Sequence, residues 1–84
     1  MNNTIMRKID VTADYQPLAS GRLVGSVEIS CSPDNAGAAY FLGDDGSDVP
    51  WVPGEWHHFR SVNLAEIKVK GTAGDVVTVV GGTW

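Results

Sequence analysis

The strand pattern of this chain is clearest in residues 65–80, AEIKVKGTAGDVVTVV. Through residues 65–70, apolar residues alternate with charged ones, which is the period-two pattern of a strand with one buried face. Residues 76–80 are almost all valine, a β-branched residue that favours strands. A cluster of glycine, threonine and aspartate lies between the two runs. The stretch therefore predicts two strands that residues 71–75 join as a hairpin.

Two segments nearer the N-terminus alternate in the same way. In residues 23–32, one face carries Val27, Ile29 and Cys31, and Cys31 is expected to be a small buried hydrophobic residue. Residues 5–12 form a second predicted strand. Its apolar face carries Ile5, Ile9 and Val11 together with Arg7.

The remaining predicted elements are shorter. Residues 38–42 are mostly apolar and predict a central strand, whereas Pro50 keeps the extended residues 49–52 near a sheet edge, because proline lacks the ladder donor. Residues 56–60 are compatible with a strand. The one place for a helix is a single turn over residues 62–65.

Turn residues separate these segments at short and regular intervals. Pro53-Gly54 suits a type II turn, because proline presets φ at the first central position and glycine accepts a positive φ at the second. About six to eight short strands with such turns predict an all-β fold: a small antiparallel β-sandwich or barrel, jelly-roll or immunoglobulin-like. We expect a single domain over residues 1–84, with short tails at residues 1–4 and 81–84.

Composition excludes several classes of function. The 84 residues include 10 acidic and 6 basic residues, a net charge of −4, which argues against nucleic acid as the main partner. No apolar run reaches the length of a membrane span or of a secretory signal, so we expect no membrane partner. Cys31 is the only cysteine and fits synthesis in a reducing cytoplasm. A domain this small often needs partner subunits for stability.

No constellation for catalysis or metal binding is visible. His57 and His58 are neighbours on a predicted strand, so they point to opposite faces and cannot serve one reacting centre. Together with Cys31 they do not form a spaced zinc ligand set. The acidic residues 44–48 are interpreted as a solvated hairpin tip, with calcium as the alternative. We therefore expect neither an enzyme nor a metal site nor a cofactor.

The tryptophans are the main candidates for contacts with a partner. Trp51, Trp56 and Trp84 are many for so short a chain, and tryptophan is enriched at interfaces. Trp56 is expected in or near the core, and Trp51 and Trp84 fit an interface or the core equally well. On the first strand, Ile5 and Arg7 are further candidates for contact with a neighbouring chain.

Several segments of the chain also carry a resemblance to a known group of proteins. They are Ser26-Val27-Glu28-Ile29-Ser30, Asn35-Ala36-Gly37, Tyr40-Phe41-Leu42-Gly43-Asp44, Val52-Pro53-Gly54-Glu55 and residues 63–79 with Gly71-Thr72-Ala73-Gly74-Asp75. In this order and spacing, over about residues 24–80, the chain resembles small virion proteins of tailed bacteriophages. The tryptophans of the segment from Pro50 to Trp56 and the end at Trp84 fall outside the shared pattern.

The resemblance implies a compact β-sandwich on a phage particle with no catalytic residues. The expected role is a capsid decoration or cement protein that binds the phage major capsid protein. Such a protein is made in the bacterial host cytoplasm and found in the virion. A homo-oligomer is expected, with a trimer favoured, because closed rings suit threefold positions on a shell. The alternative is a carbohydrate-binding or adhesin-like module of a phage fibre, or a head–tail accessory protein.

Overall fold

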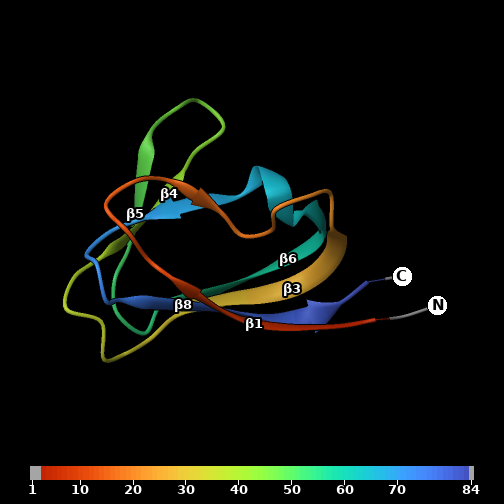
Figure 1. The fold of residues 1–84 in the computed structure, drawn as a ribbon, viewed down its shortest axis with the longest axis horizontal. Coiled ribbons are helices and arrows are strands. Elements are labelled where there is room, and N and C mark those ends of the chain that lie inside the picture. The colour runs from red at the N-terminus through yellow and green to blue at the C-terminus, as the bar shows by residue number, and fades with distance from the viewer. Residues whose placement is uncertain (1–2, 84) are drawn as a thin grey trace.

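A computed structural model describes residues 3–83 of the chain, which form two antiparallel sheets packed face to face (Figure 1). The first sheet has the order β1-β8-β3-β6 and the second β2-β7-β4-β5. The prediction of a small antiparallel β-sandwich is confirmed. The elements are β1 Thr4–Asp10, β2 Gln16–Pro17, β3 Val24–Cys31, β4 Ala39–Leu42, β5 Asp48–Trp51, β6 Trp56–Asn63, the 3-10 turn η1 Leu64–Glu66, β7 Lys68–Lys70 and β8 Val76–Gly82.

The core lies between the two sheets and follows the alternation of the sequence. Val27, Ile29 and Cys31 are buried on β3, as predicted, and every second residue of β8 packs against them. Each fully buried valine or isoleucine contributes about 1.5–3 kcal/mol to folding. The buried apolar residues are Ile5, Val11, Leu18, Ala19, Val27, Ile29, Cys31, Ala39, Phe41, Trp51, Leu64, Val69, Val77 and Val79.

The predicted hairpin over residues 71–75 is wrong. β7 and β8 lie in different sheets, so this segment crosses from one layer of the sandwich to the other. Asp75 holds this crossing segment in place. Its buried carboxylate accepts hydrogen bonds from the backbone N–H groups of Ala36 (2.8 Å) and Gly37 (3.2 Å). Alternation shows which face of a strand is buried, but two strands on opposite layers show the same pattern.

The predicted strand over residues 65–70 is shorter in the structure. Its first residues belong to η1, and only Lys68–Lys70 pair as β7. The side chain of Asn63 caps η1, because its Oδ1 accepts a hydrogen bond from the N–H of Ala65. This is the position at which the sequence allowed one helical turn, and the turn buries Leu64.

The sheet edges agree with the placement of proline. Pro17 lies in β2 and Pro50 in β5, which are the two edges of the second sheet, while β4 is central in it as predicted. The turn before β6 has the geometry expected for type II. Gly54 has φ +86°, and the N–H of Glu55 donates to the carbonyl of Val52 at 3.0 Å.

Part of the residues expected as tails, 1–4 and 81–84, belongs to strands. Thr4 belongs to β1, and Gly81 and Gly82 belong to β8, where they pair with both β1 and β3. Gly81 is required there, because a Cβ atom on it would lie 2.1 Å from the carbonyl oxygen of Ser26. The last glycines therefore allow a close approach of two strands.

Candidate functional site

Trp51 lies in the core. Its side chain is 5% exposed and stacks on Phe41 with ring centroids 4.0 Å apart. The ring of His57 meets it edge-on at 4.7 Å, and the ring of Phe59 lies 6.3 Å away and nearly parallel. Of the two roles that the sequence left open for Trp51, the structure selects the core, so it is no longer a candidate for a surface anchor.

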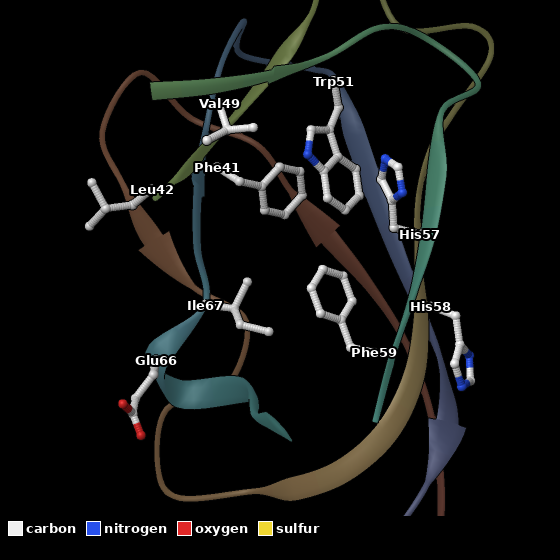
Figure 2. A pocket seen from close by; sticks show the side chains of 9 residues that line it. All are labelled: Phe41, Leu42, Val49, Trp51, His57, His58, Phe59, Glu66 and Ile67. Atoms are coloured by element: carbon white, nitrogen blue, oxygen red, sulfur yellow. The ribbon is translucent and has the colours of Figure 1, made fainter. Parts of the chain in front are cut away.

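Beside these rings, an apolar cleft opens on the side of the sandwich where β5 and β6 form the edges of their sheets. Its volume is about 460 Å³, within the range of small-molecule sites. Figure 2 shows the rings of Phe41, Trp51 and Phe59 directed into it, with His57 beside Trp51 and His58 directed away. The cleft is lined by Phe41, Leu42, Val49, Trp51, His57, His58, Phe59, Glu66 and Ile67.

The imidazole of His57, which lines the cleft, is engaged with the turn before β6. The Nε2 atom of His57 lies 2.7 Å from Oε2 of Glu55, and Oε1 of Glu55 accepts a hydrogen bond from the N–H of Val52. The hydrogen bond with His57 is the main reason why the pKa of Glu55 is lowered. This arrangement ties the turn to β6.

A second surface is the outer face of the sheet β1-β8-β3-β6, called the outer face below. The second sheet packs on one side of this sheet, and Figure 1 shows no element over the other side within the described residues. Three large apolar side chains are exposed on it: Met6 (73%), Trp56 (59%) and Val80 (47%). Met6 and Val80 are cross-strand partners on β1 and β8.

The polar residues of the outer face form rows across the sheet. Glu28 lies between Val80 and His58 in the register. Ser30 lies beside Trp56, and its hydroxyl is 2.8 Å from that of Thr78. The face is therefore mostly polar and partly apolar, which suits contact with another macromolecule.

The prediction that Trp56 lies in or near the core is wrong. In the register, Trp56 lies beside Ser30, whose side chain is on the outer face, whereas His57 lies beside the buried Ile29. A histidine thus takes the inward position that the sequence suggested for tryptophan. His57 and His58 point to opposite sides, as predicted (Figure 2).

The two contact residues predicted on β1, Ile5 and Arg7, lie in different environments. Ile5 is buried at 4% exposure and belongs to the core, so it offers no contact surface to a neighbour. Arg7 is exposed, and its Nη1 donates a hydrogen bond to the carbonyl oxygen of Leu18 at 3.3 Å. Arg7 therefore links β1 to the segment after β2. Trp84 lies outside the described residues.

The acidic residues 44–48 form the tip between β4 and β5. The carboxylate of Asp45 accepts hydrogen bonds from the N–H and hydroxyl of Ser47, and these bonds lower its pKa. Asp48 begins β5, accepts a hydrogen bond from the hydroxyl of Tyr15 and pairs with Lys70 at 3.5 Å. Within residues 3–83, no three metal-ligating side chains gather at one place.

Comparisons with models of known protein families, with curated proteins and with solved structures find no match to this chain. Among the residues that the structure describes, no helix is long and apolar enough to span a membrane.

Proposed function

We propose that this chain is a non-catalytic structural protein of a tailed bacteriophage virion. It decorates or cements the head by binding the major capsid protein, after synthesis in the bacterial host cytoplasm. The support for the phage assignment is the resemblance over about residues 24–80. The observation that carries a binding role is the outer face, where Met6, Val80 and Trp56 remain exposed on one sheet.

The physical argument concerns what such a face does. An exposed methionine and an exposed valine that are cross-strand partners form one apolar patch, and burying it against a protein removes that area from water. A specific contact buries about 800 Å² on each partner, more than these side chains alone supply. The polar rows of Ser30, Thr78 and Glu28 extend the contact area and form its hydrogen bonds.

Cosedimentation with purified phage heads tests the proposal. The wild-type chain is expected to pellet with heads, and Met6→Glu and Val80→Glu are each expected to weaken binding about tenfold, because each places a charge in the apolar patch. Val52→Glu is the matched control, since Val52 is also 59% exposed but lies in the turn before β6. A chain that never binds heads would refute the proposal.

A homo-oligomer, with a trimer favoured, belongs to the same proposal. Light scattering of the purified chain measures it directly, and a strict monomer that also fails to bind heads would argue against the virion role as a whole.

One observation favours the alternative of a carbohydrate-binding module. Trp56 is exposed beside the Ser30 and Thr78 hydroxyls, and an aromatic face next to hydroxyl groups is suited to a sugar ring. A glycan array with wild type and Trp56→Ala separates the two functions. Binding of glycans that Trp56→Ala abolishes, with no binding of heads, would establish the alternative.

A further inference from the structure

Strand β6 is the edge of its sheet. Among residues 3–83 it pairs only with β3, so its backbone N–H and C=O groups on the other side have no strand partner. The pairing is regular from Trp56 to Phe59. It then shifts at a bulge where Arg60 and Ser61 face Ser26, and Ser61 has φ +50°. An unpaired edge of this kind is a template for an added strand, and a bulge limits its length.

The apolar cleft lies directly beside this edge. His57 and Phe59, at alternate positions of β6, point inward and line it (Figure 2). Successive side chains of a strand point to opposite faces. A strand added beside β6 would therefore direct every second side chain toward the space between the sheets, against Phe59 and Ile67, and the others outward beside His58.

The charges of β6 select the outward residues of such a strand. β6 carries His57, His58 and Arg60 and no acidic residue. Among the described residues, Arg60 forms no ion pair, while Glu28 lies on the β3 side of His58. Glu66 lines the cleft, but its carboxylate already accepts a hydrogen bond from Asn63. Because opposite charges are favoured across neighbouring strands, an acidic side chain fits the position beside Arg60. An acidic side chain beside His58 can accept a hydrogen bond from the imidazole N–H.

We propose that β6 accepts an extended segment of a protein partner in which apolar and acidic residues alternate. The segment adds to the sheet as a strand, places its apolar side chains in the cleft and its acidic side chains beside His58 and Arg60. This inference rests on the proposed role as a protein-binding module and specifies how one partner is held. It uses the edge of the sheet and leaves the patch of Met6 and Val80 free for a second contact.

The probe is a synthetic peptide, Val-Glu-Val-Glu-Val with blocked ends, titrated into the isotope-labelled chain and followed by two-dimensional NMR. The expected result is that the largest shifts map to the backbone amides of residues 56–60. Val-Lys-Val-Lys-Val and Ser-Glu-Ser-Glu-Ser are the peptide controls, and each is expected to bind about tenfold more weakly, because one reverses the charges and the other removes the apolar contacts. These controls leave the protein unchanged, so loss of folding does not confuse them.

Two N-methylated peptides test strand addition itself. In an antiparallel ladder, alternate residues direct their backbone groups at the partner and the others direct them away. Methylating the amides of one alternate set therefore blocks binding, and methylating the other set leaves it intact. Slipping by one residue does not rescue the blocked peptide, because a slip would turn its apolar side chains to the outer face.

On the protein, Arg60→Glu is expected to weaken binding of Val-Glu-Val-Glu-Val about tenfold and to improve binding of the lysine peptide. Lys8→Glu is the matched control, since Lys8 lies on β1, at the opposite edge of the same sheet. The inference is overturned if the shifts map away from β6, if both methylated peptides bind equally, or if the two variants behave alike. If heads still bind the chain in that case, the proposed function stands without it. If the peptide binds and heads do not, the inference about β6 stands and the proposed virion function fails.

Discussion

The side-chain amide of Asn35 exchanges two hydrogen bonds with the backbone of Val76. Its Nδ2 donates to the carbonyl oxygen at 3.0 Å, and its Oδ1 accepts from the N–H at 2.9 Å. Asn35 thus takes the place of a strand neighbour at the N–H of Val76, while the Val76 carbonyl oxygen also accepts a hydrogen bond from the N–H of Ser32 at 3.1 Å. The neighbouring Asp75 binds the next two backbone N–H groups after Asn35, so the loop after β3 is fixed to the crossing between the sheets.

Replacing Asn35 by leucine removes both bonds. The N–H of Val76 then loses its bond to Asn35, while the Val76 carbonyl oxygen keeps the bond from the N–H of Ser32. We expect the free energy of unfolding to fall by about 1–3 kcal/mol. For a domain of this size, each kcal/mol lowers the melting temperature by about 4–8 °C, which calorimetry resolves. Asp34→Ala is the control, because Asp34 is exposed and adjacent, and it is expected to change stability by less than about 0.5 kcal/mol. Equal losses in the two variants would contradict this role of Asn35.

Trp51 and Trp56 provide a comparison of the same substitution in two environments. Trp51→Ala empties a stacked position in the core and is expected to cost about 3–5 kcal/mol of stability. Trp56→Ala removes a side chain from the outer face and is expected to cost less than about 1 kcal/mol. Denaturant unfolding followed by far-ultraviolet circular dichroism measures both variants. A Trp51→Ala chain as stable as wild type would show that Trp51 is not part of the core.

Gly81 is predicted to tolerate no side chain. Gly81→Ala places a Cβ atom within 2.1 Å of the Ser26 carbonyl oxygen and 2.7 Å of the Val27 Cα, both of them backbone atoms that cannot rotate away. We expect β3 and β8 to separate locally, with a loss of about 1–3 kcal/mol from overpacking. In Gly21→Ala the new Cβ meets no atom within 4 Å, so this variant is expected to match wild type. Thermal unfolding measures the stability of both variants, and equal melting temperatures would contradict the requirement for glycine at position 81.

The sequence predicted the strands well and their partners poorly. Alternation located β1, β3 and the buried faces that carry Val27 and Ile29, because a half-buried strand repeats every two residues. It could not separate a hairpin from a crossing at residues 71–75, since the turn chemistry is the same in both. What decides between them is the contact of Asp75 with Ala36 and Gly37, about 40 residues away in sequence.

The candidate site was harder to predict than the fold. Residue type alone favours tryptophan inside and histidine outside. The structure instead exposes Trp56 on the outer face and turns the half-exposed His57 toward the ring of Trp51. The register with β3 could have shown it, because it aligns Ile29 with His57. Register depends on the bulge at Ser61, which no short-range signal in the sequence marks. The cleft depends further on which strands are edges, and that is a property of the whole topology.

Cys31 is predicted to make stability depend on pH in alkaline solution. Burial, followed by the charges of Glu55 and Asp75, raises the pKa of this thiol from 9.0 to about 11. Between these two values the unfolded chain loses the thiol proton while the folded chain keeps it. The folded state therefore binds more protons, and the free energy of unfolding must fall as the pH rises from 9 to 11. Well below pH 9 the thiol is protonated in both states, so it contributes no slope there.

The measurement is urea unfolding at several pH values for wild type and Cys31→Ala. Tyr15 acts in the same direction, because its hydrogen bond to Asp48 raises its pKa to about 12, so both chains carry Tyr15→Phe as a common background. The chain with Cys31 is expected to lose stability more steeply above pH 9 than the alanine variant. The same raised pKa keeps the folded thiol protonated and slow toward disulfide reagents at about pH 8, with fast reaction only after unfolding. Parallel pH profiles, or rapid labelling of the folded chain, would contradict the burial of Cys31 on β3.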